Sequence, residues 1–232
     1  MQFADRMISN FDALVSRFEP DPSTLTEVIR IAASSTPAEY LVPALVAEFT
    51  REHTDISVEV QVTDSAQVAR TLADRQAGLG ISVMPPTSVG YSSIAMSRDE
   101  VVLAVSSDHA FSAQRSISIE QLRVENIVER EVESGTCPTV VQSLSATGID
   151  LPEHRVSMTL GSTQAVAATV EKNLAIGFAT KYAVGHHSTD VTAVRIEGLV
   201  LERDLKLFYE TGRVRGRHTQ AFIDFIYSRT NQ

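Results

Sequence analysis

The sequence predicts an α/β protein that is built as two lobes around one cleft. Segments with the patterns of strands and helices alternate along the chain, first over residues 28–105 and again over residues 127–179. Two turns rich in hydroxyl side chains, Ser34-Ser35-Thr36 and Ser134-Gly135-Thr136, each follow an apolar run and precede a helical pattern. A chain of 232 residues can form one large domain or two small lobes, so we expect one such turn in each lobe, both facing the cleft.

Residues 3–18 have the pattern of an amphipathic helix. Large apolar side chains recur there at steps of three and four, namely Phe3, Met7, Phe11, Leu14 and Phe18. Two prolines at positions 20 and 22 end the pattern. The helix either packs on its own domain or acts as a dimerising or linker helix. We favour the second, because the stripe precedes the globular pattern and a proline linker separates the two.

The first lobe is expected to form a β-α-β-α-β unit. Residues 57–62 alternate valine with polar side chains, as a half-buried strand does, and Gly78 stands where glycine commonly ends a helix. Residues 101–105 are a continuous apolar run, which is typical of a parallel strand covered on both faces. The expected strands are 28–33, 57–62, 79–83 and 101–105, and the expected helices are 37–50 and 65–77.

The second half repeats this alternation without a sequence repeat. A late strand over residues 205–209 and a closing helix over residues 219–229 then return the chain to the first lobe. The closing helix turns Phe222, Phe225 and Ile226 inward. The expected strands of the second lobe are 127–128, 156–160 and 174–179, and its expected helices are 138–146 and 162–172.

The composition excludes several classes of protein. With 20 Lys and Arg against 29 Asp and Glu, the net charge is −9, which disfavours direct nucleic-acid binding because phosphate contacts need clustered cations. The short basic cluster at residues 213–218 is interpreted as a solvated loop. A single cysteine, Cys137, excludes an intrachain disulfide and a cysteine zinc cage. Without a signal-peptide pattern or an apolar run of membrane-spanning length, we expect a cytoplasmic protein with no membrane partner.

The first hydroxyl-rich turn is a candidate ligand site. A helix start presents unpaired N–H groups and a partial positive charge, and hydroxyls beside them form a cradle for an anion or a small polar ligand. Thr36 with Glu39 is interpreted as a capping box, and Pro37 as the first helical residue. A capping box does not account for Ser34 and Ser35, so we expect these two, together with Thr36, to bind the ligand.

The second turn repeats this logic. Pro138 is expected to start a helix that Thr136 or Cys137 caps. Gly135 lets the backbone approach a ligand closely, and Ser134 adds a hydroxyl beside it. This turn is therefore expected to hold the other side of the same ligand.

Two further positions are candidates for the same cleft. Ser162 and Thr163 open a helical pattern after a strand, and they are either an ordinary N-cap or part of the ligand site. Thr180 directly follows the apolar run 174–179 and is expected to line the cleft.

An enzyme is not expected. The sequence has no Gly-x-Ser-x-Gly elbow, no phosphate loop and no dinucleotide-binding glycine pattern. His186 and His187 are adjacent and point in different directions, so we expect no shared metal, and no cofactor is indicated. Cys137 is a hypothetical redox or alkylation sensor, since a helix N-terminus lowers a thiol pKa. The alternative for Cys137 is a small, partly buried side chain.

Along nearly its full length, the chain resembles the effector-binding domain of LysR-type transcriptional regulators. The matching pieces include Asp99-Glu100-Val101-Val102-Leu103 and Gly161-Ser162-Thr163-Gln164-Ala165. The resemblance depends on the order and spacing of all the matching segments. These segments are residues 28–36, 40–49, 99–103, 108–109, 117–122, 130–136, 161–165 and 221–225.

The resemblance implies two Rossmann-like lobes joined by two crossover segments, similar to type 2 periplasmic binding proteins. Residues 1–25 would be a linker helix and proline linker, 26–104 with 209–232 lobe I, and 105–208 lobe II, with hinges near Val105 and Leu205. A small effector, expected to be anionic, would bind between the lobes. The resemblance places it against Ser34, Ser35, Thr36, Ser134, Gly135 and Thr136, with a contribution from Ser65.

The resemblance also implies a homodimer or homotetramer that controls transcription. DNA would be bound only through an N-terminal winged helix-turn-helix that these residues do not contain, so the chain is either an excised sensor domain or a stand-alone solute-binding protein. One departure bears on the effector. Cys137 stands where the family often has arginine after Ser-Gly-Thr, which removes a candidate cation for an anion.

Overall fold

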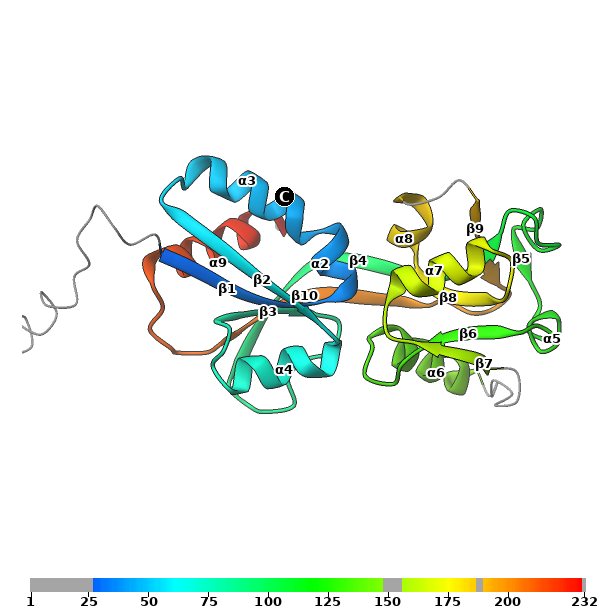
Figure 1. Ribbon diagram of the computed structural model, residues 1–232. Coiled ribbons are helices and arrows are strands. Elements are labelled where there is room, and N and C mark those ends of the chain that lie inside the picture. The colour runs from blue at the N-terminus through cyan, green and yellow to red at the C-terminus, as the bar shows by residue number, and fades with distance from the viewer. Residues whose placement is uncertain (1–26, 148–155, 187–189, 231–232) are drawn as a thin grey trace, which may run out of the picture.

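The chain forms two α/β lobes that are joined by two long strands (Figure 1). The computed structural model describes residues 27–147, 156–186 and 190–230. The expected N-terminal helix over residues 3–18 and the linker that follows it lie outside the described residues. The two-lobed α/β class predicted from the sequence is confirmed.

The first lobe has a sheet in the order β2-β1-β3-β10, in which the first three strands are parallel. Helices α3 and α9 cover one face of this sheet and α4 covers the other (Figure 1). Phe49 of α3 and Phe222 of α9 meet in the core at 5.0 Å between ring centroids. The elements are β1 (Glu27–Ser34), α2 (Ser35–Tyr40), α3 (Val42–Glu52), β2 (Ile56–Thr63), α4 (Ser65–Ala73), β3 (Leu79–Ser82) and α9 (Arg217–Thr230).

The second lobe places β6 between its parallel neighbours β7 and β8. Two apolar clusters lie on its sheet, one including Val140 and Leu144 of α6 and the other Val166 and Val170 of α7. The elements are β5 (Ser116–Ile117), α5 (Ile119–Leu122), β6 (Ile127–Arg130), α6 (Thr136–Ala146), β7 (Val156–Leu160), α7 (Thr163–Glu171), β8 (Ile176–Thr180), α8 (Lys181–His186) and β9 (Val191–Ile196).

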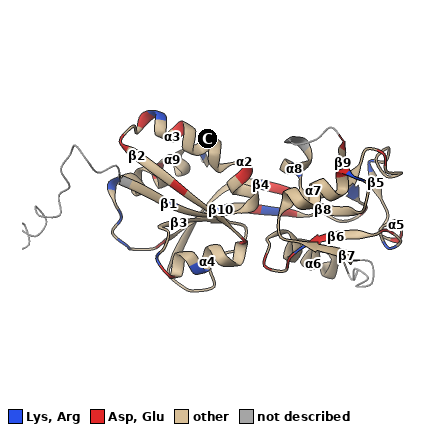
Figure 2. Cartoon of the chain, in the orientation of Figure 1, with Lys and Arg blue, Asp and Glu red and all other residues tan. Residues whose placement is uncertain are grey.

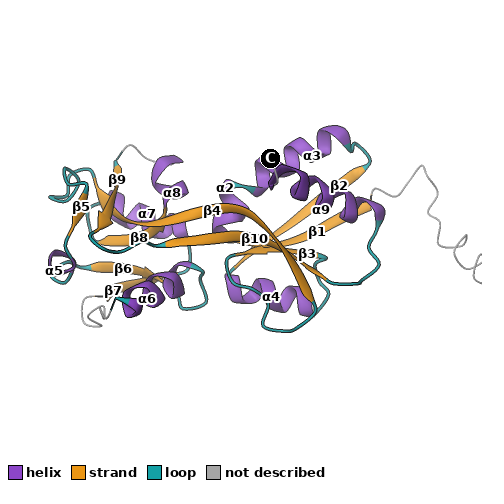
Figure 3. Ribbon diagram, turned by 180° about the vertical axis from the view of Figure 1, so that it is seen from behind, coloured by secondary structure: helices purple, strands orange, loops and turns teal. Residues whose placement is uncertain are grey.

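Strands β4 (Tyr91–Ser106) and β10 (Glu202–Glu210) connect the lobes (Figure 3). Over residues 91–100, β4 pairs antiparallel with β10, and over residues 101–106 it pairs antiparallel with β8 and β9. The expectation that residues 101–105 form a parallel strand is therefore wrong. These residues are at most 4% exposed, and burial on both faces produces an apolar run whichever way the neighbouring strands point.

The change of pairing partner in β4 falls between Glu100 and Val101. There the Val101 N–H donates to the Leu201 carbonyl at 2.8 Å. This exchange point lies some residues before the hinges expected near Val105 and Leu205. The lobe boundaries at residues 104 and 208 stay a prediction.

The starts of two helices differ from those expected. Helix α2 begins at Ser35 with Ser34 as N-cap and no side-chain cap bond, so the capping box between Thr36 and Glu39 is wrong. Helix α6 begins at Thr136, so neither Thr136 nor Cys137 is its N-cap. The hydroxyls of Thr36 and Thr136 instead accept hydrogen bonds from the distant side chain of Arg203.

The single helix expected over residues 37–50 is two helices, separated at Leu41. Pro43 stands in the first turn of α3, where a helix does not need the N–H group that proline lacks. For the same reason, Pro43 cannot donate the hydrogen bond that would continue α2. Strands β5 (two residues) and β9 (six residues) were not expected from the sequence.

Candidate functional site

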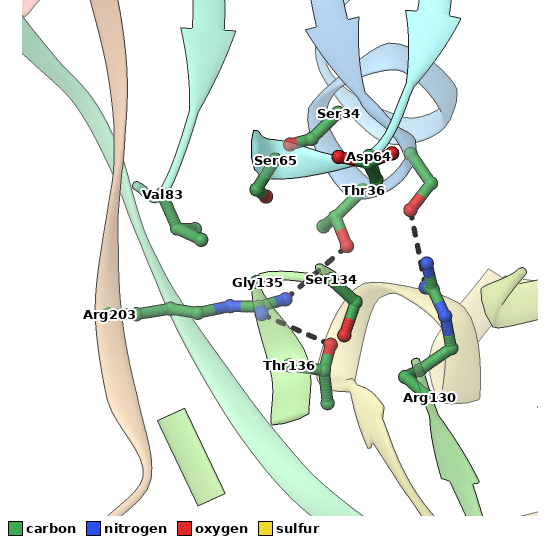
Figure 4. A pocket seen from close by; sticks show the side chains of 11 residues that line it. Ser34, Thr36, Asp64, Ser65, Val83, Arg130, Ser134, Gly135, Thr136 and Arg203 are labelled. Atoms are coloured by element: carbon green, nitrogen blue, oxygen red, sulfur yellow. Dashed lines mark hydrogen bonds between the residues drawn. The ribbon is translucent and has the colours of Figure 1, made fainter. Parts of the chain in front are cut away.

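A small polar pocket lies between the lobes, where β1, β2 and β6 end and the segments leading into α2, α4 and α6 meet (Figure 4). Carboxyl ends of parallel strands are the usual place for ligands in α/β proteins. The pocket brings together most of the residues singled out from the sequence, namely Ser34, Ser35, Thr36, Ser65, Ser134, Gly135 and Thr136. That these residues bind a ligand stays a prediction.

Arg203 of β10 spans the pocket and contacts both lobes (Figure 4). Its Nη2 donates to the Thr36 hydroxyl at 3.3 Å and its Nη1 donates to the Thr136 hydroxyl at 3.1 Å. Its Nε and Nη2 lie 2.8 and 2.7 Å from Oδ2 of Asp99, the residue directly opposite on β4. The Arg203 guanidinium therefore binds Thr36 of the first lobe and Thr136 of the second lobe at the same time.

The Arg203–Asp99 ion pair is buried, with the Asp99 side chain 0% and the Arg203 side chain 6% exposed. Burial lowers the pKa of Arg203, and the charge of Arg130 acts in the same direction, whereas Asp99 opposes both. The second oxygen of Asp99 accepts a hydrogen bond of 2.6 Å from the Thr180 hydroxyl. Asp99 is thus held by Arg203 of the connecting strand β10 and by Thr180 of β8.

Arg130, the last residue of β6, makes a second link between the lobes. Its Nη1 donates to the Ser35 hydroxyl at 3.3 Å and to the Thr163 hydroxyl at 2.7 Å. Its Nε and Nη2 bind the two carboxylate oxygens of Glu131 at 2.8 and 2.7 Å, which is the bidentate geometry that arginine favours. The pocket therefore has two guanidinium groups on its walls and hydroxyl groups between them.

Ser65 and Gly135 lie close together across the pocket. The Ser65 hydroxyl is fully buried and has no hydrogen-bond partner among the described residues. A Cβ atom on Gly135 would lie 3.0 Å from that hydroxyl and 2.1 Å from Cγ2 of Val83. Only glycine allows the second lobe's turn to approach the first lobe this closely, as its sequence context predicts.

The pocket has little free space, with a cavity of about 10 Å³. That volume corresponds to about one water molecule. A metabolite can enter only if the lobes separate or if the arginine side chains leave their hydroxyl partners. Arg130 and Arg203 therefore link the two lobes through hydrogen bonds to hydroxyl groups around this cavity.

The remaining candidates from the sequence do not line the pocket. Ser162 caps α7 by accepting a hydrogen bond from the Ala165 N–H at 3.1 Å, which is the ordinary N-cap role left open above. Thr163 and Thr180 are not among the lining residues. The Thr163 hydroxyl accepts a hydrogen bond from Arg130, and the Thr180 hydroxyl donates one to Asp99. Their hydroxyls position the charged groups rather than face the cavity.

Cys137 does not have the environment of a reactive thiol. Burial raises its pKa, and the carboxylates of Glu129, Glu131 and Glu133 raise it further. The expectation of a lowered pKa at the helix N-terminus is wrong, because burial and the neighbouring carboxylates both favour the neutral thiol. The redox-sensor hypothesis stays untested, and a raised pKa argues against it.

Sequence reasoning missed the charged residues Arg130, Arg203 and Asp99 as parts of the site. A signal was available for Arg130, which lies between the short apolar run Ile127-Val128 and the Ser134 turn. The pairing of Arg203 with Asp99 joins positions 104 residues apart. It depends on the register of β10 against β4, which local patterns do not encode.

Comparisons with known proteins agree with this architecture. Residues 23–230 match the model of the LysR substrate binding domain. The chain belongs to this family. Among curated relatives, the LysR-type matches include the HTH-type transcriptional activator CmpR of Synechocystis sp., 24% identical over 198 residues that cover 84% of this chain and 64% of that protein. A probable RuBisCO transcriptional regulator of Trichormus variabilis is 25% identical, covering 84% of this chain and 60% of the relative.

Solved LysR effector domains superpose well on this chain. The CcmR regulatory domain of Synechocystis, in complex with 2-PG, has a TM-score of 0.81 at 22% identity and covers 89% of this chain and 98% of that one. The effector-binding domain of QuiR, in complex with shikimate, has a TM-score of 0.79 at 18% identity with the same coverage. The fold is thus that of a LysR substrate-binding domain.

The chain spans between half and two thirds of the length of the first curated relatives it matches, 50%, 64% and 60% in turn. Those relatives are named as transcriptional regulators and not as enzymes. Among the described residues, none of the helices is both long and apolar enough to cross a membrane.

Proposed function

We propose that this chain is the sensing part of a LysR-type transcriptional regulator and that its interlobe pocket binds a small anionic metabolite. Its family and the regulators among its relatives support the sensing role. Related domains whose solved structures contain 2-PG and shikimate support a small-molecule ligand. We further propose that the chain dimerises and that DNA is bound through a helix-turn-helix outside these residues.

The two guanidinium groups of the pocket carry the proposal of an anion. Arg130 and Arg203 offer donors in a fixed planar geometry that matches carboxylate and phosphate oxygens. Their contacts with Ser35, Thr36 and Thr136 are neutral hydroxyl contacts at 3.1 to 3.3 Å. A carboxylate or phosphate makes a stronger bond to the same donors, because both partners are then charged.

Exchange of these contacts explains how a ligand changes the protein. In the closed form, the two arginines tie the lobes together through Ser35, Thr36 and Thr136. An entering anion takes over these donors and adds the Ser65 hydroxyl, so the lobes settle at a different separation. The ligand shifts this balance only by its difference in affinity for the two separations.

The test is a series of thermal melts with small carboxylates, phosphates and neutral metabolites at fixed ionic strength. A ligand at a hundred times its dissociation constant adds about 2.7 kcal/mol to the unfolding free energy, which is a rise of several degrees at this chain length. An anion that stabilises the chain saturably, while its neutral analogue does not, supports the proposal.

Three variants locate the binding. In the ligand-bound form, the released hydroxyls of Ser35 and Thr136 donate to the same anion, so Thr136→Ala and Ser35→Ala are expected to weaken ligand binding with little loss of fold. Thr50→Ala removes a hydroxyl that, among the described residues, donates to backbone carbonyls of α3, and it is the matched control. Wild-type affinity in both pocket variants would show that the ligand binds elsewhere.

A further inference from the structure

A second concave site lies on the outside of the second lobe. Its volume is about 330 Å³, against about 10 Å³ for the interlobe pocket. Figure 2 shows basic segments on β9 and beside β5 at this end of the molecule. Three cationic side chains and one carboxylate lie on its walls. The lining residues include Glu100, Val102, Gln114, Arg115, Lys181 and Arg195.

The charges of this groove are unusual for an acidic chain. Arg115, Lys181 and Arg195 against Glu100 give a formal charge of 3 − 1 = +2, whereas the whole chain carries −9. Lys181 Nζ and Arg195 Nε lie 3.1 and 3.0 Å from the two oxygens of Glu100. Hydrogen bonds from Arg195 and then Lys181 hold the pKa of Glu100 below its ordinary value, against the effect of burial.

Arg115 is the cation that Glu100 does not neutralise. Within the described ranges, its side chain makes no ion pair or hydrogen bond, although its carbonyl accepts one from the Arg195 N–H at 3.2 Å. The three cations come from three separate segments, since Arg115 precedes β5, Lys181 begins α8 and Arg195 lies on β9. Cations that converge from separate elements on one hollow favour a compact anion over an extended chain.

We propose that this groove binds a small molecule with two or more negative charges, a phosphorylated or polycarboxylic metabolite, independently of the ligand in the interlobe pocket. Arg115 and the outer donors of Arg195 and Lys181 bind its charged oxygens. Val102, which is 4% exposed, and Gln114 also line the groove. The binding does not depend on the sensing function proposed above.

The position of the groove connects it to the interlobe pocket. Adjacent residues on a strand point to opposite faces. Asp99 holds Arg203 in the pocket, while its neighbour Glu100 lies in the groove. Likewise, Thr180 binds Asp99 and the next residue, Lys181, binds Glu100. The groove and the interlobe pocket are therefore served by adjacent residues of β4, where that strand passes from one lobe to the other.

The test is an amide NMR titration of the chain with inorganic pyrophosphate and, separately, with citrate, at constant ionic strength. Amides of Arg115, Lys181 and Arg195 report on the groove, and those of Ser35 and Thr136 report on the interlobe pocket. We expect saturable shifts at the groove. Arg115→Gln should weaken the binding about tenfold or more, as expected for loss of a charge-assisted contact.

Arg30→Gln removes an arginine from an exposed ion pair in the first lobe and is the matched control, in which the affinity should not change. A response to pyrophosphate alone assigns a phosphoryl group, and a response to citrate alone assigns a polycarboxylate. Shifts confined to the interlobe pocket, or equal groove shifts in Arg115→Gln, overturn the second site. Binding of a poly-glutamate peptide but of neither small anion overturns it in favour of an acidic protein partner.

Discussion

The buried ion pair between Asp99 and Arg203 gives the sharpest test of the structure. Arg203→Met removes the guanidinium and keeps an apolar side chain of similar length. It leaves the Asp99 carboxylate, 0% exposed, with the Thr180 hydroxyl as its remaining side-chain partner among the described residues. Removing one partner of a buried pair costs about 3–5 kcal/mol, because the other charge stays buried and uncompensated.

The loss is measured by urea unfolding followed by circular dichroism, and by the midpoint of thermal unfolding. At this chain length, each kcal/mol corresponds to about 2–4 °C, so the midpoint should fall by about 6–20 °C. The double variant Arg203→Met with Asp99→Asn removes both charges, and it should recover most of the loss. Arg30→Met breaks an ion pair whose side chains are 58% and 59% exposed, and it should cost less than about 1 kcal/mol.

Two results would contradict the reasoning. If Arg203→Met lost no more stability than Arg30→Met, the Asp99 carboxylate would have access to water. If the double variant were no more stable than Arg203→Met alone, the loss would come from packing at β10 and not from an uncompensated charge.

Three further predictions follow from single residues. Burial, with a smaller contribution from Glu39, raises the pKa of Tyr40 from 10.0 to about 12. The neutral phenol therefore stabilises the fold below pH 10, and this contribution is lost as the pH rises through 12. The ultraviolet difference titration between wild type and Tyr40→Phe should have its midpoint near pH 12, and a midpoint near pH 10 would refute this prediction. The raised pKa of Cys137 predicts slower reaction with a thiol reagent at neutral pH than a free thiol, and an equal or faster rate would restore the sensor hypothesis. Gly135→Ala forces a Cβ atom against Val83 and should cost about 1–3 kcal/mol in urea unfolding, with no change if the lobes separate freely at this turn.

The sequence predicted the candidate pocket better than it predicted the helix starts around it. Hydroxyl side chains directly after apolar strands are a local pattern, and parallel strands bring their carboxyl ends to one edge of a sheet. Each lobe therefore presents its hydroxyl-rich turn at such an edge, and the two edges face each other, so Ser35, Thr36 and Thr136 lie around one pocket, as expected. Their role differs from local capping, because arginines from other elements occupy their hydroxyls.

The sequence by itself determined the alternation of strands and helices, the two-lobed class and the hydroxyl-rich turns, because each depends on periodicity and on residues next to one another. The tertiary structure decided the direction of β4, the closure of the pocket and the partners of its charges. The physical reason is how far apart along the chain the interacting residues lie. The link between Arg203 and Asp99 depends on the register of strands about a hundred residues apart, and register is set by the packing of whole faces rather than by local sequence.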